Sequence, residues 1–148
     1  MTLGIILAAQ DPEDLQVLSA RLQDAVAQVR DLVWLPKAQR FAAVFNRFKW
    51  EDAGRKRGAA LRVRAGLSFE RVTSAKSHKI RYDNPKAVLS LLAIRFEPRG
   101  EEDPGGAIEL LFSGGGVIRL EVECVEASLS DIGSEWPARR KPTHPLAG

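Results

Sequence analysis

The apolar residues of this chain follow a helical spacing in one stretch near the start and a spacing of two almost everywhere after it. Asp11 is a suitable helix N-cap, Pro12 suits the first helical position, and apolar side chains recur at three- and four-residue steps from Leu15 to Val29. These features predict one amphipathic helix that packs a single apolar stripe against a core. Parallel strands would need crossover helices between them, so the pattern excludes a parallel α/β fold.

The period-two segments predict a series of sequential antiparallel strands. They cover 2–8, 32–35, 40–50, 61–70, 88–96, 108–112 and 118–129, with a weaker candidate at 73–82. Bulges are expected near Asn46 and after Cys124, where the apolar parity changes. The expected fold is α+β: one N-terminal helix packed on a strongly curved, mainly antiparallel sheet or partly closed barrel of about seven to eight strands, with the helix over one opening.

The length of 148 residues fits one domain, since domains usually contain about 100–150 residues. We expect a single globular α+β domain at 1–132 and a tail at 133–148 that contains Arg139, Arg140, Lys141 and three prolines. One cysteine, no leader-like segment and no long apolar run predict a cytoplasmic protein that does not enter a membrane.

Positive charge is concentrated in one part of the chain. The segment 47–81 has eleven basic and three acidic residues, a net charge of +8, while the remainder has eleven basic and sixteen acidic residues and a net charge of −5. Such asymmetry either reflects a solvated sheet face with a charged loop or produces a basic surface for an acidic protein or nucleic acid. The candidate contact residues are Arg47, Lys49, Arg55, Lys56, Arg57, Arg62 and Arg64.

Common catalytic and metal-binding patterns are missing from the sequence. His78, His144 and Cys124 are far apart, and the run 101–103 (EED) lacks the spacing of a calcium loop, so no metal is expected. Cys124 is interpreted as a packed thiol on an apolar strand. The glycines at 114–116 are expected to form a hairpin turn, because phosphate-binding glycine loops lead into a helix. We assign no catalytic residue and no cofactor.

Several segments together resemble a known family. They are 22–25 (LQDA), 35–37 (LPK), 45–50 (FNRFKW), 89–96 (LSLLAIRF) and 112–120 (FSGGGVIRL). As a set they look like a small bacterial family of single-domain proteins classified as a domain of unknown function (family 2948). The resemblance covers nearly the whole chain, and it assigns chemistry to none of the residues.

The sequence therefore favours a non-enzymatic binding or interaction module that uses its basic residues, although it does not settle whether the protein is an enzyme. An acidic protein surface is slightly favoured over nucleic acid as partner, because a net charge of +3 is modest for a dedicated nucleic-acid binder. One alternative is an enzyme or small-ligand carrier with a pocket in the curved sheet. Another is an accessory subunit of a second protein. The oligomeric state is open.

Overall fold

The computed structural model describes residues 6–48 and 61–137, which form one α-helix, ten strands and three short 3₁₀ helices. In chain order the elements are β1 (Ile6–Ala9), α1 (Pro12–Arg21), β2 (Val26–Gln28), η1 (Val29–Asp31), β3 (Leu32–Leu35), η2 (Pro36–Ala38), β4 (Arg40–Phe48), β5 (Leu61–Phe69), β6 (Val72–His78), β7 (Val88–Pro98), β8 (Gly106–Phe112), η3 (Ser113–Gly115), β9 (Val117–Val122) and β10 (Ala127–Pro137).

The ten strands form one curved antiparallel sheet. Its order is β1-β10-β5-β4-β2-β7-β8-β9-β6, and β3 pairs with β4 beside this path. The short strand β2 joins the two halves, because Val26 pairs with Asn46 of β4 and with Ser90 of β7. No strand pairing within the described residues connects β1 to β6, so hydrogen bonds do not close the sheet. The predicted α+β class and curved sheet are confirmed, with ten strands where about seven to eight were expected.

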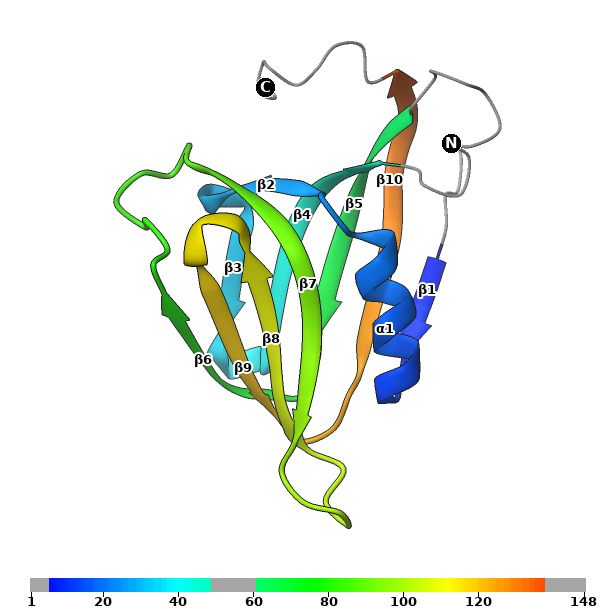
Figure 1. Ribbon diagram of the computed structural model, residues 1–148, viewed down its shortest axis with the longest axis vertical. Helices are drawn as coiled ribbons and strands as arrows, with labels where there is room; N and C mark the ends of the chain where they lie inside the picture. Colours follow the sequence, from blue (N-terminus) through cyan, green and yellow to red (C-terminus); the bar gives the residue numbers. More distant parts are fainter. Residues whose placement is uncertain (1–5, 49–60, 138–148) are drawn as a thin grey trace.

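The helix α1 lies between β1 and β7 and covers the opening between them (Figure 1). Its N-cap is the predicted one: the Asp14 N–H donates to the Asp11 carboxylate at 2.7 Å. Leu15 and Leu18 are buried in the core that fills the curved sheet. The backbone N–H of Ile94 in β7 donates to the Ser19 hydroxyl at 2.9 Å, so the helix is also hydrogen-bonded to the sheet.

The helix is shorter than predicted and ends at Arg21. Asp24 then takes a left-handed conformation with φ of 66°, and its N–H donates to the Leu91 carbonyl of β7 at 2.9 Å. The chain continues into β2 instead of another helical turn. The apolar spacing of three and four residues up to Val29 wrongly predicted a longer helix. From Ala25 to Val29, every second residue is buried, as in a strand.

The predicted bulge near Asn46 is also wrong. The β4–β5 register runs without interruption from the pair Phe41–Phe69 to the pair Phe48–Arg62. Regular alternation therefore places Arg47 on the core side of β4, and Phe48 on the opposite, outer side. The prediction assumed that Phe48 had to share a face with the other aromatic residues, whereas the core accepts a paired arginine instead.

The predicted long bent strand after the glycine hairpin is two strands. β9 ends at Val122, and β10 begins at Ala127 in a different part of the sheet. Two hydrogen bonds hold the segment between β9 and β10 against the turn that joins β5 to β6. The Glu123 N–H donates to the Arg71 carbonyl, and the Glu70 N–H donates to the Glu126 carbonyl. β10 continues to Pro137, beyond the domain boundary expected at 132. Residues 138–148 of the expected tail lie outside the described residues.

Candidate functional site

Arg47, the first of the predicted contact residues, is buried. Its Nε donates to Asp131 Oδ1 at 2.9 Å and its Nη2 to Asp131 Oδ2 at 2.7 Å, while Nη1 donates to the Phe48 carbonyl. The exposed fractions of the two charged side chains are 0% and 3%. The expectation that Arg47 lies on a contact surface is therefore corrected. Arg47 forms an ion pair between β4 and β10 under the intervening strand β5.

Asp131 is the residue that the sequence reasoning missed. It is separated from Arg47 by 84 positions, so no local motif joins them. The sequence did contain a signal for this pair. Strand alternation places Arg47 on the same face as the buried Phe41 and Phe45, and Asp131 on the same face as the buried Ala127 and Leu129. Opposite charges at core-facing positions of two strands are typical of a buried ion pair.

Arg62 lies on the outer face of β5 and is nevertheless only 7% exposed. Its guanidinium carbon lies 4.3 Å from the centroid of the Phe48 ring, a cation–π contact between neighbouring strands. Burial lowers the pKa of Arg62. Its Nη1 atom is buried and has no hydrogen-bond partner within the described residues. Arg62 is thus a poorly solvated cation with a hydrogen-bond donor that lacks an acceptor in the described part of the chain.

Arg64 is two residues further along the same face of β5, a distance of about 6.6 Å along a strand. It is exposed and pairs in register with Asn46 on β4 and Ile132 on β10. Among the residues placed by the structure, none forms an ion pair with Arg64. The fold therefore brings Arg62 and Arg64 together as two neighbouring cations without carboxylate partners in the described ranges.

The other four predicted contact residues belong to the segment that links β4 to β5. This segment, 49–60, lies outside the described residues, and with it Lys49, Arg55, Lys56 and Arg57. Their part in a contact surface stays a prediction.

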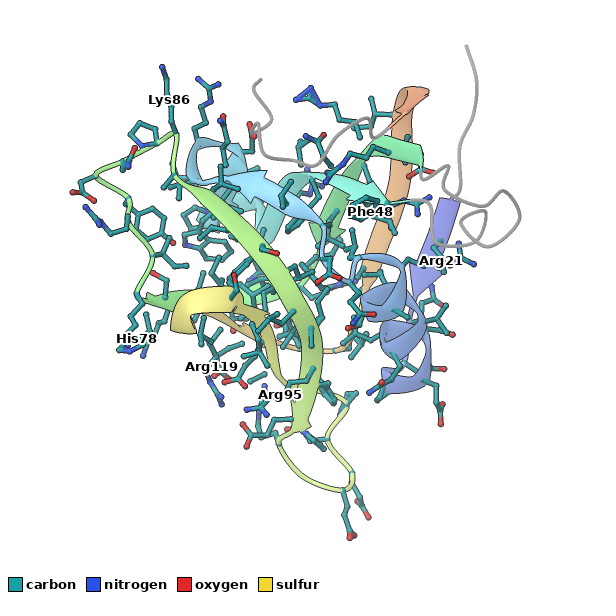
Figure 2. All side chains as sticks on the ribbon, turned by 45° about the horizontal axis from the view of Figure 1, so that its top comes forward. Arg21, Phe48, His78, Lys86, Arg95 and Arg119 are labelled. Carbon is teal, nitrogen blue, oxygen red and sulfur yellow. The ribbon has the colours of Figure 1, made fainter. Side chains whose placement is uncertain are left out.

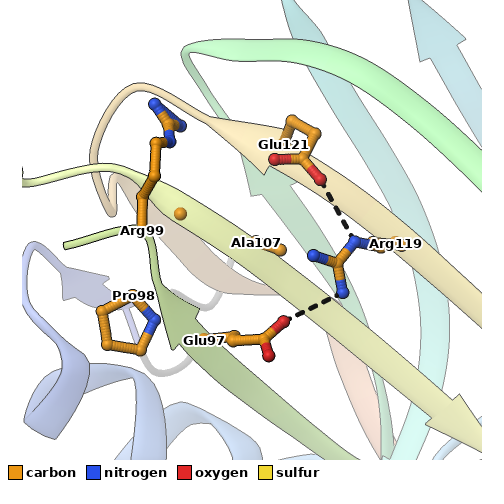
Figure 3. A pocket seen from close by; sticks show the side chains of 7 residues that line it. Glu97, Pro98, Arg99, Ala107, Arg119 and Glu121 are labelled. Atoms are coloured by element: carbon orange, nitrogen blue, oxygen red, sulfur yellow. Dashed lines mark hydrogen bonds and ion pairs between the residues drawn. The ribbon is translucent and has the colours of Figure 1, made fainter.

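A polar pocket of about 230 Å³ lies on the outer face of β7, β8 and β9 (Figure 3). Ala107 of β8 stands in register between Glu97 of β7 and Glu121 of β9, and its small side chain leaves a hollow between the two carboxylates. Arg119 spans this hollow. It donates through Nη1 to Glu97 at 3.1 Å and through Nε to Glu121 at 3.1 Å.

The ion pairs continue beyond the pocket. Arg119 Nη1 also lies 2.9 Å from Glu109, which pairs with Arg95 at 2.8 Å. Burial by itself raises the pKa of Glu109, but hydrogen bonds from Arg95 and Arg119 outweigh it and lower the pKa. Hydrogen bonds from Arg119 to Glu109, Glu121 and Glu97 raise the pKa of Arg119. Figure 2 shows Arg95 and Arg119 near each other, well away from Phe48. The pocket is lined mainly by polar groups that already neutralise one another.

The chain matches a family model described as a protein of unknown function (DUF2948), over residues 5–144. It belongs to this family. No curated protein and no solved structure matches the chain. Membership in the DUF2948 family assigns no catalytic or binding role to any of the residues above.

The remaining chemical candidates do not converge in this member of the DUF2948 family. The residues that the structure describes contain no group of three or more His, Cys, Asp or Glu side chains able to hold a metal. Cys124 is half-buried and lies between β9 and β10, so it is not the strand residue that was predicted. His78 is exposed at the end of β6. No helix in the described part of the chain is long and apolar enough to cross a membrane.

Proposed function

We propose that the protein is a non-enzymatic binding module whose contact surface is the outer face of β5, centred on Arg62 and Arg64. The observation that carries this proposal is the exposed Arg64, which has no ion-pair partner within the described residues and lies beside a second, poorly solvated cation, Arg62. A carboxylate from a partner would accept from the exposed Arg64 guanidinium and reduce the repulsion between the two cations. The basic residues proposed to extend the surface are Lys49, Arg55, Lys56 and Arg57.

Arg47 has a supporting role in this proposal. Its charge is neutralised by Asp131, and the pair joins β4 to β10 across the core side of β5. The three strands that carry the surface are thereby held in one arrangement. Arg62 and Arg64 then need little reordering to meet a partner, which reduces the entropy cost of binding.

The proposed partner is an acidic face of another protein. The whole chain has a net charge of only +3, which favours a local contact over the extended phosphate contacts of a nucleic-acid binder. The cytoplasm is the proposed location, since the one cysteine, Cys124, is free.

The test compares the double variant Arg62→Gln/Arg64→Gln with a control, Lys37→Gln/Lys86→Gln, that removes the same charge from exposed positions elsewhere. The probes are a fluorescent polyglutamate peptide and a short single-stranded DNA, titrated at low and moderate salt. We expect polyglutamate to bind the wild type more tightly than the DNA does. Binding to the double variant should be weaker by about tenfold to a hundredfold, the effect of one lost hydrogen bond to a charged group.

The control variant should bind polyglutamate almost as the wild type does. Equal weakening in both variants would mean that only net charge matters, and would refute a contact surface on β5. Tighter binding of the DNA, lost in the β5 variant, would assign the surface to nucleic acid instead of protein. Urea unfolding of each variant verifies that the fold is retained.

A further inference from the structure

β6 is a terminal strand of the sheet with one free edge. It pairs with β9 on one side, and within the described residues no strand pairs with its other side. Among the hydrogen bonds of the described residues, one holds the start of this edge, where the Val72 N–H donates to the Gln39 carbonyl at 2.9 Å. The strand forms the margin of the molecule in Figure 1, and Lys76, Ser77 and His78 are exposed. Alternate backbone N–H and C=O groups of such a strand point outward and are able to pair with another chain.

The outer face of the sheet carries a row of charges that ends at this edge. In register across four strands stand Arg95, Glu109, Arg119 and Lys76. The first three alternate in sign and are joined by ion pairs of 2.8 and 2.9 Å. Lys76 breaks the alternation, because it stands opposite Arg119, and no carboxylate among the described residues pairs with it. The row therefore ends in an unneutralised positive charge.

This charge selects among the strands that could join the edge. An antiparallel pairing of two copies of β6 centred on Lys76 would place two ammonium groups directly opposite each other, which is destabilising. A strand with Asp or Glu at that position would neutralise the charge at the end of the row and form a favourable cross-strand pair. The edge thus disfavours a second copy of the same strand and favours an acidic one.

We propose that β6 is a docking edge for an extended acidic segment of a partner protein, which adds to the sheet as a further strand and places a carboxylate opposite Lys76. Backbone hydrogen bonds supply affinity in this mode, and the alternate side chains supply specificity. The edge is distinct from the β5 surface: five strands lie between β5 and β6 in the sheet order. Figure 2 likewise shows His78 of β6 far from Phe48, the neighbour of Arg62. The two proposals therefore succeed or fail independently.

The probe is an acetylated, fluorescent peptide of alternating valine and glutamate. We expect it to bind the wild type and to slow amide hydrogen exchange at Thr73–His78. Reversing the charge with Lys76→Glu should weaken binding by about three- to tenfold, the effect of turning one attractive cross-strand pair into a repulsive one. A peptide with lysine in place of its central glutamate should regain affinity for this variant. Lys86→Glu, an equal charge change at an exposed position outside β6, should leave binding unchanged.

A second control separates strand addition from attraction between charges. The same peptide, N-methylated at alternate residues, keeps its carboxylates but loses the N–H groups needed for pairing, and should not bind. Undiminished binding of the methylated peptide, unchanged exchange in β6, or equal effects of Lys76→Glu and Lys86→Glu would each overturn the proposal. The Arg62→Gln/Arg64→Gln variant should bind this peptide normally, so a failure of the β5 proposal remains distinguishable.

Discussion

The buried ion pair between Arg47 and Asp131 leads to the sharpest prediction about stability. Asp131→Ala removes two hydrogen bonds of 2.9 and 2.7 Å and leaves the guanidinium of a fully buried arginine without its counter-charge. Breaking a buried pair in this way costs about 3–5 kcal/mol of unfolding free energy. For a chain of this length, the same loss lowers the midpoint of thermal unfolding by about 6–20 °C, at roughly 2–4 °C per kcal/mol.

Replacing both partners distinguishes the cost of an uncompensated buried charge from the contribution of the ion pair itself. Arg47→Met/Asp131→Leu places apolar side chains in the same space, so the unfolding free energy should recover to within about 2 kcal/mol of wild type or exceed it. The matched control is Arg40→Gln, which breaks the exposed pair with Glu70 at 2.9 Å, where the side chains are 46% and 30% exposed. That loss should not exceed about 1 kcal/mol, because water solvates the separated charges.

Urea unfolding followed by circular dichroism measures all three variants, and equal denaturant slopes verify that the unfolded states are comparable. A cost below about 1 kcal/mol for Asp131→Ala would refute the reasoning, since a desolvated arginine cannot lose its counter-charge so cheaply. A double variant as unstable as Asp131→Ala would also contradict it. In that case the specific hydrogen bonds of Arg47, and not the uncompensated charge, would dominate.

Three further predictions concern single positions. Because the pKa of Glu109 is lower in the folded state than in the unfolded state, its ionised form stabilises the fold, and this stabilisation is lost as the pH falls through the folded-state pKa. The wild type should therefore lose more unfolding free energy than Glu109→Gln on acidification from about pH 5. Parallel curves of unfolding free energy against pH would contradict this. Gly106→Ala should destabilise by about 1–3 kcal/mol, because the added Cβ would meet the backbone carbonyl of Glu97. Gly100→Ala should be nearly neutral, because its Cβ would only reach ordinary contact with Asp103 at 4.0 Å; equal melting temperatures of the two variants would show that the strand yields. Asp11→Ala removes the N-cap of α1 and should cost about 0.5–2 kcal/mol by urea unfolding, and no measurable change would mean that tertiary packing alone starts the helix.

The basic residues show how far sequence reasoning about a site extends. Strand alternation correctly placed Arg62 and Arg64 together on the outer side of β5, since that placement depends only on neighbouring residues. It did not show that Arg62 would be buried against Phe48, because this contact depends on the register between two strands. The row of charges from Arg95 to Lys76 has the same origin. Its residues lie on four different strands, and the order of these strands in the sheet cannot be read from the sequence of any one strand.

Local signals in the sequence determined the helix start at Asp11, the hairpin turns after Leu35 and Phe112, the alternation of β5 and the absence of crossover helices. Each depends on hydrogen bonds or periodicities within a few residues, so no distant contact changes it. Only the tertiary structure decided where the helix ends, because Leu91 of β7 holds the backbone of Asp24. It alone placed Arg47 in the core, since a buried charge is tolerated only beside its counter-charge, and that counter-charge comes from a strand 84 residues away.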